Sequence, residues 1–236
     1  MRLLRHCLVA GVVALAASCS SAAPPSATPT QTPETTPPST PSPTPVQTES
    51  ILELADGGTM FPGTYRTQFV PAMTITINNL VDLDCAPGYR CRGDIDVNIE
   101  HWLDLEFGNV HGAELMVVRL DQVWIDESKG TTKLPPDDLA AWIASRPGIT
   151  EVNPAVTASV GGIAGTRLDL HPAHDVGFGP NFGIAGDAHK RAWITVLNVR
   201  GSWVLIVEVL GPENSVDNFD TVVRGLQPIV DSIVWN

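Results

Sequence analysis

The chain has 236 residues, with 14 Lys and Arg against 26 Asp and Glu, which gives a formal net charge of −12. A surface this acidic repels phosphate groups, so we exclude nucleic acid as a partner. The length is enough for one sizeable folded domain and extensions beside it.

Residues 1–18 have the pattern of an export signal. Arg2 and Arg5 precede an apolar run of about ten residues, which is about half the length of a membrane-spanning helix. Ala16, Ala17 and Ser18 are small residues of the kind found just before a cleavage site. We therefore predict a signal peptide that is removed from the mature protein.

Cys19 follows this segment directly. Residues 15–19 read LAASC and resemble a bacterial lipoprotein signal, in which the cysteine receives a diacylglycerol and becomes the first residue. The resemblance implies a protein anchored by lipid and palmitate-type acyl chains on the outer face of the bacterial cytoplasmic membrane. Secretion without acylation and an uncleaved membrane anchor are the alternatives.

Residues 19–50 consist mainly of Pro, Thr, Ser and Ala. Such a composition cannot bury enough apolar surface to offset the entropy of ordering, so we predict a disordered tether with polyproline-II character. The globular domain is then expected over residues 51–236.

Cys85 and Cys91 are the cysteines left for this domain once Cys7 is removed and Cys19 is acylated. Pro87 and Gly88 between them favour a tight turn, and the expected compartment is oxidising. We predict a disulfide between Cys85 and Cys91 that stabilises one loop locally.

Alternating apolar residues predict strands, taken in chain order, over 64–69, 73–77, 94–99, 103–107, 115–120 and 122–125. Further on, Gly161-Gly162 and Arg200-Gly201 each lie between two apolar segments and predict hairpins. The strand 203–210 is almost entirely apolar, which predicts a central strand covered on both faces by helices.

Two helices are expected. The first begins after Pro135-Pro136 and ends at Pro147-Gly148, with Leu139, Trp142 and Ile143 at helical spacing. The second covers about 216–233, where apolar residues recur every three or four positions. Each helix should bury one face against the sheet.

The segment AAWIASRPGITEVNPAVTASVGGIAGTRLDL, followed by the Arg-Gly hairpin and the closing helix, resembles a domain of uncharacterised exported actinobacterial proteins. The signal, tether and domain together are similar, more distantly, to the mycobacterial LpqN and LpqT lipoproteins. This resemblance implies an α+β fold of the PsbP-like type, an α/β/α sandwich in which helices pack on an antiparallel β-sheet.

One segment carries residues that suit metal chemistry. Residues 168–190 read as a Gly-rich loop between two strands and contain His171, His174, Asp175, Asp187 and His189. Imidazoles and carboxylates are zinc ligands, but Pro172 opposes a helix that would align His171 with His174. A solvated loop is the competing interpretation.

The sequence lacks the Gly-x-Ser-x-Gly, His-Glu-x-x-His, Ser-x-x-Lys and phosphate-loop motifs. We therefore expect a non-catalytic binding or interaction module of the cell envelope, without a cofactor. Its partner would be an envelope protein or a lipid-like ligand held between sheet and helix. The alternative is a hydrolase with a divalent metal at His171, His174, Asp175 and His189.

Overall fold

A computed structural model describes residues 50–55, 57–77, 93–107, 113–186, 190–210 and 218–236. These residues belong to one unit, Gln47–Asn236. The predicted signal peptide, most of the tether, Cys19, Cys85 and Cys91 lie outside the described residues.

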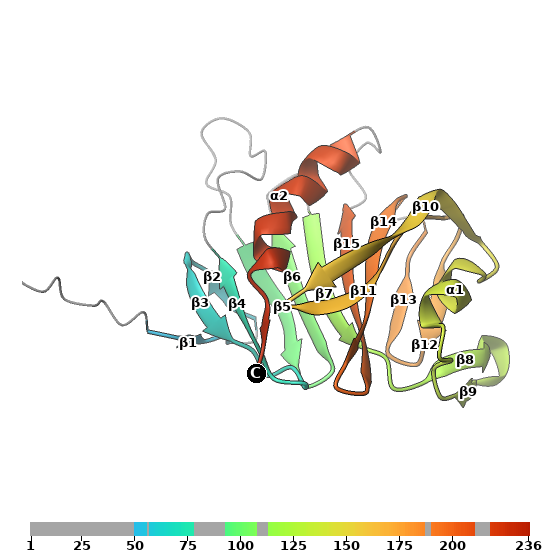
Figure 1. Cartoon of the computed structure of the whole chain (residues 1–236), viewed down its shortest axis with the longest axis horizontal. Helices are drawn as coiled ribbons and strands as arrows, with labels where there is room; N and C mark the ends of the chain where they lie inside the picture. The colour runs from blue at the N-terminus through green and yellow to red at the C-terminus, as the bar shows by residue number, and fades with distance from the viewer. Residues whose placement is uncertain (1–49, 56, 78–92, 108–112, 187–189, 211–217) are drawn as a thin grey trace, which may run out of the picture. The chain divides into compact units, whose positions relative to one another are not determined.

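An antiparallel sheet of eight strands forms the centre of the described residues, in the order β10-β11-β14-β15-β7-β6-β5-β2 (Figure 1). Its strands are β2 (Thr59–Met60), β5 (Gly93–Ile99), β6 (Trp102–Phe107), β7 (Ala113–Arg119), β10 (Ile149–Val160), β11 (Ile163–Pro172), β14 (Ala192–Val199) and β15 (Ser202–Leu210).

A second sheet has the order β1-β3-β4-β16, and two hairpins pair β8 with β9 and β12 with β13. The bounds are β1 (Leu52–Glu53), β3 (Gly63–Arg66), β4 (Met73–Ile77), β8 (Val123–Asp126), β9 (Thr131–Lys133), β12 (Val176–Gly179), β13 (Phe182–Ile184) and β16 (Val234–Trp235). The helices are α1 (Leu139–Ala144) and α2 (Phe219–Asp231), with a short 3-10 turn at Glu127–Lys129.

Strand β15 separates two apolar cores. Val204 and Ile206 face a core formed with α2 and the second sheet. Leu205 and Val207 face the other core, which includes residues of α1 and of the β12–β13 hairpin. The prediction of a central strand buried on both faces is therefore confirmed, because alternate side chains of a strand point to opposite faces. The prediction that helices cover both faces is wrong in part, since the second sheet lies beside α2 on one face and the β12–β13 hairpin beside α1 on the other.

The predicted antiparallel sheet is confirmed, but the layers differ from an α/β/α sandwich. The described residues contain only two α-helices, α1 of 6 residues and α2 of 13. Strands supply much of the material on both faces, so the fold is mainly β.

The two predicted hairpins are present. Gly161 and Gly162 both have positive φ, as do Arg200 and Gly201, which is what a two-residue turn of type I′ requires. The predicted loop over 168–190 is wrong in part, because β11 continues to Pro172 and the hairpin β12–β13 follows. Phe178 and Phe182 of that hairpin are buried and stack with ring centroids 5.7 Å apart, which accounts for its formation.

Candidate functional site

The predicted metal ligands are dispersed rather than gathered. His171 lies on β11, where its Nδ1 contacts the carbonyl oxygen of Lys190. His174 lies beyond β11, with Nδ1 2.8 Å from the carbonyl oxygen of Asp175. Across the described residues, no group of three or more His, Cys, Asp or Glu side chains is placed to hold a metal ion. His189 is outside those residues.

An ion-pair network joins the sheet to the first turn of α2. Arg191 donates to both carboxylate oxygens of Asp169, at 2.8 and 2.7 Å, and pairs with Asp220 of α2 at 3.2 Å. Asn153 of β10 also donates to Asp169, at 2.6 Å. Burial opposes ionisation of Asp169, but the hydrogen bonds from Arg191 and Asn153 hold its pKa below the ordinary value. The Asp169 carboxylate is thus engaged from within the protein, and we assign the network a structural role.

Glu208 of β15 is a buried carboxyl group on the side of the sheet that faces α2. Its exposed fraction is 1%, and Oε2 has no hydrogen-bond partner. Burial raises the pKa of Glu208 to about 8; the charge of Arg167 opposes this rise and that of Asp231 adds to it. The side chain is therefore mostly neutral at pH 7 and has almost no contact with solvent.

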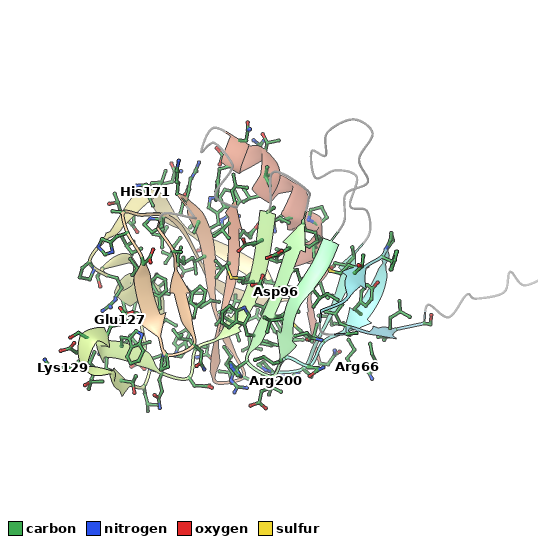
Figure 2. The ribbon with its side chains drawn as sticks, turned by 180° about the vertical axis from the view of Figure 1, so that it is seen from behind. Arg66, Asp96, Glu127, Lys129, His171 and Arg200 are labelled. Atoms are coloured by element: carbon green, nitrogen blue, oxygen red, sulfur yellow. The ribbon has the colours of Figure 1, made fainter. Side chains whose placement is uncertain are left out.

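The opposite side of the sheet carries a group of carboxylates on β5, β6 and β7. We call Asp96, Asp104, Glu106 and Glu114 the acidic face. Glu106 of β6 lies directly opposite Glu114 of β7, a position where Cβ atoms are about 5 Å apart and like charges repel. Asp96 lies where the register between β5 and β6 shifts. Figure 2, viewed from behind, labels Asp96 on these strands, and no other described helix or strand lies in front of them.

Asp104 is the buried member of the acidic face. Its exposed fraction is 8%, and Oδ1 has no hydrogen-bond partner. Burial, together with the negative charges of Glu114, Asp96 and Glu106, raises the pKa of Asp104 to about 7. A carboxyl group at such a position binds a proton or another cation more readily than an isolated aspartate does.

Trp102 lies in the same row as Asp104 and Glu106, because alternate residues of β6 share one side of the sheet. Its ring is half-buried against the core that contains α1, and its indole nitrogen has no hydrogen-bond partner. The row therefore combines an aromatic ring with two carboxyl groups, and this combination favours the binding of cationic groups.

A cavity of about 250 Å³ lies between the end of β7 and the turn that joins β12 to β13. Arg119 lines it, but Nε and Nη2 of this side chain are bound to Asp121 at 3.0 to 3.1 Å. Nη1 donates to the carbonyl oxygen of Val70 at 3.0 Å. Since these contacts occupy the guanidinium group of Arg119, it is not available to bind an anionic ligand in the cavity.

The acidic face was not predicted, although the sequence contains a signal for it. In the segment WLDLEF, Asp104 and Glu106 alternate with the apolar residues that form the core, so two carboxylates must lie on one side of a strand. What the alternation cannot reveal is the register that places Glu114 and Asp96 beside them.

The described residues contain no helix long and apolar enough to cross a membrane. The predicted lipidation at Cys19 and the disulfide between Cys85 and Cys91 concern positions outside those residues.

In comparisons with known proteins, no family model matches the chain and no curated protein matches it.

Proposed function

We propose that the chain is an exported, lipid-anchored binding module of the bacterial cell envelope, which acts without catalysis and holds a partner at the acidic face. The export signal, Cys19 and the Pro- and Thr-rich tether support the anchored location. The proposal does not depend on the resemblance to the PsbP-like lipoproteins.

The observation that carries the binding role is the state of Asp104. A buried carboxyl group with an unpartnered oxygen and three acidic neighbours lowers the stability of the folded protein. An apolar side chain on β6 would avoid this cost. Destabilising groups of this kind concentrate at functional sites, where a ligand supplies the missing interaction.

The position of Asp104 also suits binding. Strand β6 is paired with β5 on one side and β7 on the other, and the opposite side of β6 packs Leu103 and Leu105 into the core. The backbone that carries the acidic face is therefore fixed by hydrogen bonds and packing. A site on such strands is held in place before the partner arrives.

A metal-dependent hydrolase built on His171, His174, Asp175 and His189 was the alternative. No observation in the described residues favours it, since one ring nitrogen of His171 and one of His174 each contact a backbone carbonyl oxygen. The binding module is therefore the function we propose.

Site-specific crosslinking tests the proposal. The full chain, produced in a bacterial host that acylates lipoproteins, would carry a photoreactive residue at Asp96 or, as a control, at Glu151, which is exposed on β10. We expect a discrete crosslinked species from position 96 and none from position 151, and we expect Cys19→Ala to abolish both fatty-acid incorporation and the crosslink. The same crosslinks from both positions, or none from position 96, would refute the proposed role of the acidic face.

A further inference from the structure

We propose that the acidic face binds a lysine- and arginine-rich segment of a partner polypeptide. This inference rests on the proposed function and specifies the chemistry of its partner.

The charges around Asp104 are complementary to those of a basic partner. Among the described residues, the charges that act on Asp104 are those of Asp96, Glu106 and Glu114, and all are negative. A cation placed among them gains attraction from several carboxylates at once, and this attraction is stronger at a partly buried group than in open water.

The burial of the Asp104 side chain favours a cationic partner independently of the number of carboxylates. Asp104 is 92% buried, the complement of its 8% exposed fraction, and its Oδ1 accepts no hydrogen bond. An ammonium or guanidinium group on the acidic face would compensate the buried charge of Asp104, and interactions with a charged partner are the stronger ones.

The arrangement of the carboxylates favours a polypeptide over a metal ion. They belong to three adjacent strands, and β5 and β7 are about 10 Å apart because neighbouring strands are separated by about 4.8 Å. A calcium ion requires oxygen ligands at about 2.3 to 2.6 Å. Consistent with this, no group in the described residues is placed to hold a metal. Several lysine or arginine side chains on one chain can instead reach carboxylates spread over this width.

Trp102 adds a contact that a basic side chain can use. Its half-buried ring lies in the row of Asp104 and Glu106, so an ammonium or guanidinium group at Asp104 has an aromatic ring next to it. Cations are attracted to the face of an indole ring, and arginine and lysine are the side chains that make this contact in proteins.

Binding of a labelled basic peptide tests the inference. Purified full-length protein in detergent would be titrated into fluorescein-labelled octalysine at pH 8 and 150 mM salt, with labelled octaglutamate as the control peptide. The double variant Asp96→Asn/Glu106→Gln removes two exposed charges from the acidic face. The matched variant Glu127→Gln/Glu151→Gln removes two charges elsewhere.

We expect octalysine to bind and octaglutamate not to bind. The variant of the acidic face should bind octalysine about tenfold more weakly, from the loss of two ionic contacts, while the matched variant should stay within about twofold of the wild type. Equal weakening in both variants would show attraction to overall charge and would overturn the inference. No octalysine binding, or spermine binding as tight as octalysine binding, would also overturn it.

The two proposals can fail separately. A specific crosslink from position 96 without octalysine binding would leave the binding module intact and would overturn the basic partner. Octalysine binding at the acidic face without any crosslink in the envelope would support the chemistry of the face and count against the proposed function.

Discussion

At pH 8, Asp104→Asn should stabilise the protein, which is the opposite of what most core substitutions do. The side chain keeps its size but loses the ability to ionise. The pKa of Asp104 is about 7 in the folded protein, against an ordinary value of 3.8. Because the folded state holds the proton more tightly, the contribution of Asp104 to stability falls as pH rises from about 4 to 7 and then stays constant.

The size of the effect follows from these two values. The difference of about 3 pH units corresponds to about 4 kcal/mol, at about 1.4 kcal/mol per unit. The asparagine amide in turn leaves a buried polar group imperfectly paired, which costs about 1 to 3 kcal/mol. We therefore expect a net stabilisation of about 1 to 3 kcal/mol at pH 8. At pH 4 the wild-type carboxyl group is largely neutral in the folded protein while the cost of the amide remains, so we expect a net destabilisation of up to about 2 kcal/mol.

Urea unfolding followed by circular dichroism at pH 4, 6 and 8 measures this difference. Glu127→Gln is the control, since Glu127 lies in the 3-10 turn, away from the acidic face. A destabilised Asp104→Asn protein at pH 8, or a difference that does not change with pH, would refute the reasoning.

The other predictions concern the interior and the sheet. In the wild type, Glu208 should lower the free energy of unfolding as pH rises from about 4.5 to 8, because burial raises the pKa of Glu208 to about 8. Glu208→Gln should remove this dependence, so the free energy of unfolding in urea should change less with pH in the variant. Arg191→Ala should cost about 3 kcal/mol because it leaves Asp169, whose side chain is 10% exposed, as an unpaired charge, whereas a cost below about 0.5 kcal/mol would contradict the structural role. Gly165→Ala places Cβ 2.2 Å from the carbonyl oxygen of Val196, so thermal unfolding should show a loss of at least about 2 kcal/mol, and an unchanged melting temperature would be inconsistent with this packing.

Local signals in the sequence were sufficient for several parts of the fold. The hairpins at Gly161-Gly162 and Arg200-Gly201 were predicted because a type I′ turn depends only on residues with accessible positive φ and on their flanking strands. The strand Met73–Ile77 was predicted with its correct ends, since its apolar residues alternate and all face the core.

The hairpin β12–β13 was missed for a physical reason. Its sequence VGFG and FGI is rich in glycine, which lowers the propensity for strands and suggests a loop. The hairpin is stabilised by tertiary contacts, namely the stacking of Phe178 on Phe182 and the edge-to-face contact of Phe178 with Trp142 of α1. Such contacts are not visible in a local pattern.

The acidic face depends on register, which the sequence does not specify locally. Asp104 and Glu106 could be placed on one side of a strand, but Glu114 comes from β7 and Asp96 from an irregular position of β5. A shift of one residue in either pairing would have moved those carboxylates to the other side. The histidine segment was the more visible pattern, yet its described members are occupied by backbone contacts.

Zero-length crosslinking tests most directly whether lysine side chains bind at the acidic face, because a carbodiimide joins carboxylates to lysine amines that touch them. Full-length protein would be treated with octalysine and a carbodiimide at pH 7, and the modified peptides would be identified by mass spectrometry. We predict that octalysine is attached mainly within residues 93–107 and 113–119, at the carboxylates of the acidic face. Attachment spread evenly over the 26 acidic residues of the chain would contradict a specific binding surface.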